Sequence, residues 1–178
     1  MIGGTLTGHE ADRPDDGISA EEFKAVFRRH AGGVAVITAQ GPAGPIGFTA
    51  TSVISLSVDP AYLAFSVNAL SSSRGVIETA GTVVVNILSS DQTAMADRFA
   101  SPARDRFADL PTTLLPNGDV VLTGCTAWVQ GRVERNIDVG NSLLVVVRAV
   151  AAGLGTKTWP LVYVDRAYHR LSEDTRFS

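Results

Sequence analysis

The sequence is poor in the residues that carry most catalytic and metal chemistry. It has a single cysteine, Cys125, and three histidines that lie far apart along the chain. One cysteine cannot form an intrachain disulfide, and without a partner at ligand spacing it indicates no metal site. Because Cys125 lies in an apolar segment, the pattern is more typical of a buried thiol than of a nucleophile.

The standard motifs of several enzyme classes are also missing. The sequence contains no GxGxxG, GxxxxGKS/T, HExxH or GxSxG. It therefore predicts neither a glycine-rich dinucleotide loop nor a P-loop, and neither a zinc protease site nor a serine-hydrolase turn.

Charge is scarce and is not gathered into basic clusters. Charged residues make up 19% of the chain, the net charge is −3, and the densest basic pair is Arg28 with Arg29. A nucleic-acid binder needs a clustered basic surface. The longest strongly apolar run, residues 143–147, is far below the ~20 residues of a membrane helix, and the N-terminus lacks the pattern of a secretory signal. We therefore expect a cytoplasmic protein without a nucleic-acid or membrane partner.

The apolar content is sufficient for one domain with a substantial core. The 178 residues are 45% hydrophobic and include 17 glycines. Residues 1–17 are polar and without periodicity, which predicts a disordered lead-in, and residues 18–178 form the domain. Ser19 with Glu22 predicts the capping box of a helix that ends at His30, and Asp91 predicts the cap of another helix.

Most of the remaining segments read as strands. Short β-branched runs follow each other through residues 33–88, and two longer ones lie within residues 120–153. Residues 100–119 predict a long loop, and residues 161–171 a strand or hairpin. Strands without regularly alternating long helices favour a mainly β fold, a closed or nearly closed barrel with peripheral helices, over a doubly wound parallel sheet.

Residues 45–73 carry the most informative pattern. Two strands joined by an Asp59-Pro60 turn are flanked by two hydroxyl clusters, the second of which opens a predicted helix at Ser71. The clusters are Thr49, Thr51 and Ser52, and then Ser71, Ser72 and Ser73. Hydroxyls and free N–H groups at a helix start suit a phosphate group, and no Lys or Arg lies in the segment. The pattern predicts a cofactor phosphate held by neutral donors, with ordinary turns and caps as the alternative.

Six segments, in this order and spacing, resemble the flavin reductase family, which has the FMN-binding split-barrel fold. They are GGVAVITA, GFTATSVISLSVDP, FSVNALSSS, VVVNILSSDQTAMADRFA, Arg106-Phe107 and PLVYVDRAYHRL, and the resemblance covers roughly residues 20–172. It implies an NAD(P)H-dependent oxidoreductase that passes a hydride from NADH or NADPH to FMN or FAD. It also implies a homodimer that supplies reduced flavin to a partner flavin-dependent monooxygenase.

The resemblance further implies two sets of site residues. Positions that match flavin contacts in the family are Pro45, Ile46, Gly47, Phe48, Thr49, Thr51, Ser52, Ser66, Val67, Asn68, Ser72, Ser73, Arg98 and Phe99. Those that match nicotinamide contacts are Ser142, Tyr163, Val164, Asp165 and Arg166. Arg98 would add the positive charge that the hydroxyl clusters lack, and no catalytic acid or base is required.

One segment departs from the family pattern. Many members carry Gly-Asp-His where this chain has Gly140-Asn141-Ser142. A serine hydroxyl cannot carry the charge of an imidazole, so flavin binding is expected to survive while nicotinamide handling is in question. Three alternatives stay open: a split-barrel flavoprotein acting on its own small substrate, a flavin-binding redox module with little turnover, and a β-barrel interaction domain without a cofactor.

Overall fold

The fold is built around one long antiparallel sheet. The computed structural model describes residues 17–102, 105–155 and 158–176, so the lead-in expected at residues 1–17 lies outside the described residues except for Gly17. The main sheet has seven strands in the order β3-β2-β6-β9-β10-β5-β4. Their bounds are β2 Ala35–Gly41, β3 Gly44–Ala50, β4 Ile54–Val58, β5 Ala61–Asn68, β6 Thr82–Ile87, β9 Ala127–Val139 and β10 Ser142–Leu154.

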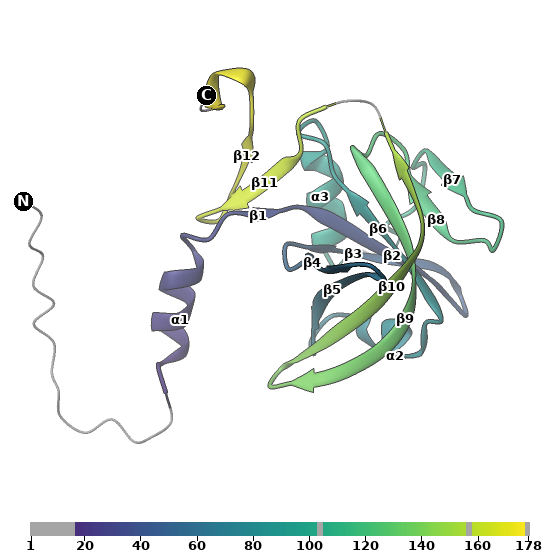
Figure 1. Cartoon of the computed structure of the whole chain (residues 1–178), viewed down its shortest axis with the longest axis horizontal. Helices are drawn as coiled ribbons and strands as arrows, with labels where there is room; N and C mark the ends of the chain where they lie inside the picture. The colour runs from purple at the N-terminus through teal and green to yellow at the C-terminus, as the bar shows by residue number, and fades with distance from the viewer. Residues whose placement is uncertain (1–16, 103–104, 156–157, 177–178) are drawn as a thin grey trace, which may run out of the picture.

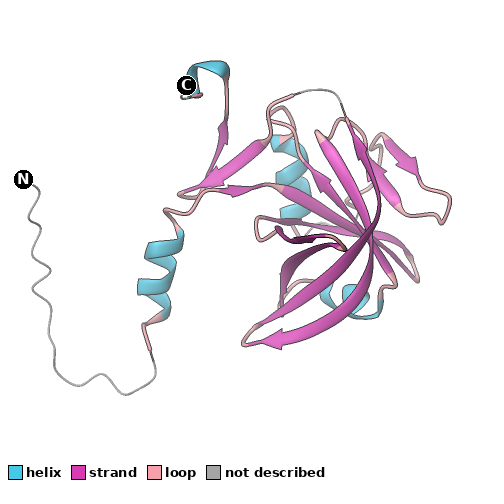
Figure 2. Cartoon of the chain, in the orientation of Figure 1, coloured by secondary structure: helices cyan, strands magenta, loops and turns pink. Residues whose placement is uncertain are grey.

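The sheet curves into a barrel that stays open. Its two edge strands, β3 and β4, are not paired with each other in the described residues, so the barrel is nearly closed and the expected split barrel is confirmed. Figure 2 shows that strands predominate and that short helices lie at the periphery. The β-branched runs explain this architecture, since Val83, Val84 and Val85 of β6 are all buried and suit a central strand.

Smaller elements cover the ends of the barrel. Strand β1 (Gly32–Gly33) pairs with a hairpin of β11 (Leu161–Val164) and β12 (Ala167–Arg170), and β7 (Thr112–Leu114) pairs with β8 (Val120–Leu122). Helix α2 (Arg74–Thr79) and helix α3 (Thr93–Ala100) pack on the sheet, whereas α1 (Ala20–Phe27) stands apart from the barrel (Figure 1). A 3₁₀ turn, η1 (Glu173–Thr175), follows β12.

Two apolar clusters form the core. The larger one joins side chains of β2, β5, β6 and β10, such as Ile37, Phe65, Val85 and Val145, to Ile77 of α2. The second joins α3 and β11 to the sheet through eight buried residues: Val34, Val36, Leu88, Ala96, Phe99, Leu122, Cys125 and Leu161. The buried thiol expected at Cys125 is confirmed.

Four local expectations need correction. Helix α1 has the expected capping box of Ser19 and Glu22 but ends at Phe27 rather than His30. Helix α3 starts after Gln92, because the Asp91 carboxylate binds Arg170 at 2.6 Å instead of capping the helix. The loop expected at residues 100–119 contains β7, and the segment expected as one strand from residue 120 is divided into β8 and β9.

The described residues contain neither a membrane-spanning helix nor a metal-binding cluster. Every helix among them is too short or too polar to cross a lipid bilayer. Within the same part of the chain, no group of three or more His, Cys, Asp or Glu residues could hold a metal ion.

Candidate functional site

Two adjoining cavities bring most of the expected site residues together. The first, here called the hydroxyl cavity, has a volume of about 600 Å³ and is lined by residues 48–52, 66–68, 70–72 and 99–102 with Arg106 and Ser142. The second, the hairpin cavity, has about 630 Å³ and is lined by residues 23–24, 27–28, 30–33, 51–54 and 163–166. Both lie in the range of ~300–1,000 Å³ typical of small-molecule sites. Thr51 and Ser52 line both, so the two cavities meet at this point of the chain.

Several hydroxyl groups of the first cavity are already committed to the protein. Ser52 Oγ accepts from the Ser66 backbone nitrogen at 3.0 Å and donates to its carbonyl oxygen at 3.3 Å. Thr49 Oγ1 donates to the Ala96 carbonyl at 2.6 Å. Ser73, expected among the flavin contacts, is buried outside the described lining and donates to the Gly47 carbonyl at 3.4 Å. These side chains hold the walls of the cavity together by joining β3, β5 and α3.

The remaining hydroxyls lie at the rim. Thr51 and Ser72 are exposed, and neither side chain has a hydrogen bond among the described residues. The second hydroxyl cluster does not open the helix at Ser71 as expected, because α2 begins at Arg74 and the side chain of its N-cap, Ser73, makes no capping bond. With only six residues in α2, the helix dipole gives little support to an anion here.

A positive charge reaches the hydroxyl cavity from Arg106. Its guanidinium donates to the Gly47 carbonyl at 2.7 Å and, through two nitrogens, to the Ser101 carbonyl at 3.0 and 2.5 Å. No ion pair of the described residues includes Arg106, and its hydrogen bonds go to backbone carbonyl oxygens. A fixed, uncompensated guanidinium beside free hydroxyls is suited to binding a phosphate group.

Arg98 does not occupy this position. Its guanidinium donates to the carbonyls of Asp105 and Ala108, and the residue lines neither of the two cavities. The positive charge at the hydroxyl cavity therefore comes from Arg106. In the sequence, Arg106 belongs to a segment that carries the family resemblance, but it was not among the expected flavin contacts. Arg74, next to the serine cluster, is already paired with Glu78 and Asp138.

Strand β3 pairs with β2 along its whole length, and its second half also lines the cavity. Pro45 and Ile46 lie outside the lining and pair with Gln40 and Ala39 of β2. A Cβ atom at Gly47 would lie 2.7 Å from the Phe99 ring, so close packing of α3 requires glycine there.

Three apolar residues of the expected set serve the core and the cavity at once. Phe48, Val67 and Phe99 are buried in the clusters described above, and all three also line the hydroxyl cavity. Ser66 and Asn68 alternate with Val67 along β5 and complete this wall.

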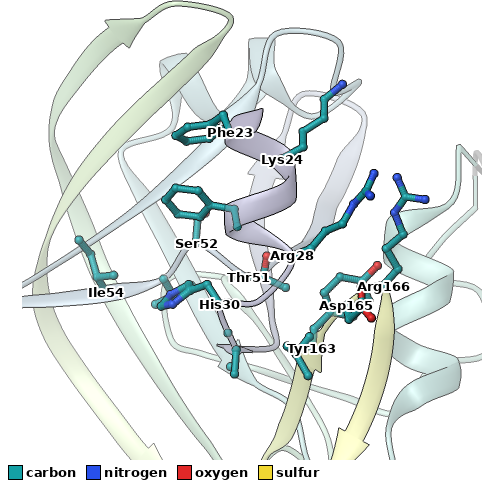
Figure 3. A pocket seen from close by; sticks show the side chains of 16 residues that line it. Phe23, Lys24, Arg28, His30, Thr51, Ser52, Ile54, Tyr163, Asp165 and Arg166 are labelled. Atoms are coloured by element: carbon teal, nitrogen blue, oxygen red, sulfur yellow. The ribbon is translucent and has the colours of Figure 1, made fainter. Parts of the chain in front are cut away.

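The residues expected near the nicotinamide divide between the two cavities. Tyr163, Val164, Asp165 and Arg166 line the hairpin cavity at the β11–β12 turn (Figure 3). Ser142 instead lines the hydroxyl cavity, opposite Asn68 in the β10–β5 register. The replaced histidine position therefore lies beside the hydroxyl clusters.

The β11–β12 hairpin is tied to α1 through its turn and packs two of its own tyrosine rings together. The backbone nitrogen of Asp165 donates to the Arg28 carbonyl at 2.9 Å, which ties the hairpin turn to the end of α1. The rings of Tyr163 and Tyr168 lie 5.3 Å apart. Burial, with the nearby charge of Asp97 on α3, raises the pKa of Tyr168 to about 12, so this side chain stays a neutral hydrogen-bond donor at physiological pH.

The described residues of the hydroxyl cavity present no constellation for acid–base or nucleophilic catalysis. The described lining of the hydroxyl cavity has hydroxyls, one amide and Arg106, but no carboxylate or imidazole. Such a site can bind, orient and neutralise an anionic ligand whose own groups react.

Comparison with known proteins supports one family. The model of the flavin reductase like domain matches residues 27–172. An NADH:FMN oxidoreductase of Rhodococcus qingshengii is 37% identical over 159 residues, which cover 86% of this chain and 83% of that protein.

Solved structures give the same result. A flavin reductase domain protein from Arthrobacter sp. FB24 superposes with a TM-score of 0.81 at 36% identity, covering 85% of this chain and 95% of that one. A homologue of nitrilotriacetate monooxygenase component B from Mycobacterium thermoresistibile gives a TM-score of 0.83 at 26% identity, with 89% of each chain covered. The chain, with its split barrel and matching domain model, therefore belongs to the flavin reductase like family.

Proposed function

We propose that the protein is an NAD(P)H-dependent flavin reductase, an oxidoreductase that uses a nicotinamide nucleotide to reduce FMN or FAD. Family membership and the relative named NADH:FMN oxidoreductase support this activity. The observation that carries the proposal for this chain is the pair of cavities joined at Thr51 and Ser52. Hydride transfer needs two flat ring systems in contact, and adjoining cavities suit two such ligands.

The residues of the hydroxyl cavity fit a flavin with a phosphorylated tail. Arg106 offers an unpaired positive charge, and Ser72 and Thr51 offer hydroxyls without a protein partner among the described residues. Phe48 and Val67 provide apolar surface for a ring system, and Ser66 and Asn68 provide polar atoms beside it. We assign Arg106 and Ser72 to the phosphate and the β3 and β5 residues to the ring and ribityl chain.

The chain's own residues have a limited chemical task. When bound, the nicotinamide and flavin supply the hydride donor and acceptor. Arg106 neutralises the phosphate, and the β3 and β5 walls fix the plane in which a ring can lie. Hydroxyls and backbone amides at the cavity walls supply hydrogen bonds, and no protein group has to exchange a proton for the reaction to proceed.

The assembly and the cellular role belong to the same proposal. Exposed apolar side chains of α1 and β4 that line neither cavity, Val26, Leu56 and Val58, support a homodimer that covers them. A monooxygenase component among the similar structures supports a role in supplying reduced flavin to such a partner. We assign this role to the cytoplasm. Light scattering coupled to gel filtration tests the dimer directly, and a monomeric mass would contradict it.

Anaerobic stopped-flow spectroscopy tests the activity. Mixing the protein and flavin with NADH or NADPH should bleach the oxidised flavin absorbance near ~450 nm with saturation in nucleotide. The matched control is the same mixture without protein. Bleaching no faster than this control with either nucleotide would reject the reductase function.

A further inference from the structure

The wall shared by the two cavities is a short segment that belongs to no strand. Residues 51–53 connect β3 to β4 at the split of the barrel, and the chain bends at Thr51. Thr51 and Ser52 line both cavities, and Figure 3 shows them in the lining of the hairpin cavity. The placement of two ligands relative to each other therefore depends on what holds this segment.

Strand β5 runs past the end of its neighbour β4 at this point. On that edge, β5 pairs with β4 only as far as Ala64, which lies opposite Ile54. Continuing the register by two residues would place Ser52 opposite Ser66, but β4 begins at Ile54. The other edge of β5 pairs with β10. Partly buried backbone groups of β5 that face the β4 side beyond Ala64 therefore need a different partner.

The Ser52 side chain takes the place of the missing strand. Its Oγ accepts a hydrogen bond from the Ser66 backbone nitrogen at 3.0 Å and donates one to the Ser66 carbonyl oxygen at 3.3 Å. One hydroxyl thus binds both backbone groups of Ser66, as the opposite residue of an antiparallel strand would. This pair of hydrogen bonds is here called the Ser52 clasp.

Other elements hold the residues on either side of Ser52. A Cβ atom at Gly32 of β1 would lie 2.9 Å from the Thr51 carbonyl oxygen, so β1 packs directly on the backbone of this segment. Gly32 pairs in turn with Tyr163 of β11, which lines the hairpin cavity. Val53 packs against the larger core cluster. The clasp therefore joins β5, a wall of the hydroxyl cavity, to a segment in contact with the β1–β11 wall of the hairpin cavity.

We infer that Ser52 is a positioning residue, and that its clasp sets how the two ligand sites lie relative to each other. This inference rests on the proposed reductase function. The Ser52 hydroxyl proton and one lone pair are committed to Ser66, which leaves little for a ligand. Transfer between two bound rings depends steeply on their contact, and a shift of ~1 Å can cost about 10²-fold in rate. Loss of the clasp should therefore lower the rate more than the affinity for either ligand.

Three substitutions separate the clasp from ordinary stabilisation. Ser52→Ala removes both hydrogen bonds, and Ser52→Thr keeps the hydroxyl that makes them. Thr126→Ala is the matched control, because Thr126 Oγ1 also donates to a backbone carbonyl, that of Ile87 at 3.1 Å, but lines neither cavity. Thermal unfolding checks that each variant keeps its fold.

Hydrogen exchange followed by NMR measures the clasp in the protein without ligands. The Ser66 amide of Ser52→Ala should exchange at least about 5-fold faster than in the wild type, because it loses its acceptor. Ser52→Thr and Thr126→Ala should keep the wild-type exchange rate at this amide. Equal protection of Ser66 in Ser52→Ala and in the wild type would overturn the clasp.

Anaerobic stopped-flow spectroscopy measures the positioning role. At saturating FMN and nucleotide, the rate constant of flavin bleaching should fall about 5- to 20-fold in Ser52→Ala, with the Kd of FMN and of the oxidised nucleotide within about threefold of wild type. Ser52→Thr should recover most of the rate, and Thr126→Ala should keep it. An unchanged rate in Ser52→Ala, or a loss of affinity as large as the loss of rate, would overturn the positioning role. A wild-type protein that does not bleach flavin would reject the reductase function, which Ser66 exchange distinguishes from failure of the clasp.

Discussion

The Arg106 guanidinium donates a hydrogen bond to the Gly47 carbonyl oxygen at 2.7 Å, across 59 residues of sequence. This bond joins the segment after α3 to the middle of β3, at the wall of the hydroxyl cavity. The same guanidinium binds the Ser101 carbonyl through two nitrogens. Its position is thus fixed before any ligand arrives, which lowers the entropy lost when it binds an anion.

Replacing Arg106 should weaken flavin binding. Arg106→Ala removes the one cation that lines the hydroxyl cavity in the described residues, and we expect the Kd of FMN to rise about 10- to 100-fold. Quenching of flavin fluorescence on titration measures this Kd. Arg106→Lys should recover part of the affinity, because it keeps the charge and loses the planar fork.

Arg98→Ala is the matched control for this prediction. Arg98 also donates to backbone carbonyls, at Asp105 and Ala108, but lies outside both cavities. Both alanine variants should therefore lose a similar ~1 kcal/mol of stability, while only Arg106→Ala loses flavin affinity. The opposite result would restore the assignment of the phosphate to Arg98.

Ser72 tests the rim of the same cavity. Ser72→Asp puts a carboxylate beside the proposed phosphate position, and repulsion at close range should raise the Kd of FMN by at least about 10-fold. Ser55→Asp makes the same change at an exposed position of β4 that lines neither cavity, and its Kd should match wild type. The comparison should be made at low salt, where screening is weak. Equal affinities in the two variants would mean that Ser72 does not face the phosphate.

Glycines 47 and 75 should respond to alanine in opposite directions. A Cβ at Gly47 would meet the Phe99 ring at 2.7 Å and the Ile37 carbonyl at 3.1 Å, so Gly47→Ala should cost about 1–3 kcal/mol by overpacking. A Cβ at Gly75, in α2, meets no atom within 4 Å, and Gly75→Ala should gain about 0.5–1 kcal/mol. Urea denaturation of both variants measures these changes. An unchanged free energy of unfolding in Gly47→Ala would show that α3 can shift without destabilising the protein.

The architecture was largely predictable from local patterns. β-branched runs such as residues 82–87 carry the signal of buried strands, and Ser19 with Glu22 carries that of a capped helix start. These features depend on neighbours in sequence, which is why they could be inferred. The prediction that Asp91 caps a helix was wrong because it used only the local pattern. In the structure, Asp91 instead pairs with Arg170, which is distant in sequence.

The site was predictable only in part, because its charges come from distant segments. The hydroxyl clusters and the β5 positions could be identified as a group, and most of them line one cavity. The position of Arg106 relative to Gly47 depends on how α3 and the segment after it pack against β3. No local sequence pattern predicts that packing. The same holds for Arg28, which lines one cavity with the expected Arg166 because β1 pairs with β11.

The Cys125 thiol should be unreactive in the folded protein. Burial raises its pKa from 9.0 to about 11, although a hydrogen bond with Gln92 opposes part of that shift. The thiolate is the reactive form, so at pH 8 native Cys125 should react with DTNB more than about 10-fold more slowly than in urea. Because Cys125 is the only cysteine, the whole signal reports on this one site.

The same pKa shift predicts a pH dependence of stability. The folded state holds the Cys125 proton more tightly than the unfolded state, so the thiol's contribution is fully present below about pH 9 and is lost as the pH rises toward about 11. The urea midpoint of the wild type should fall over this range more than that of Cys125→Ala, which has no thiol to titrate. Parallel curves for the two proteins, or native labelling as fast as in urea, would show that the thiol is accessible to solvent and that its pKa is close to the ordinary value.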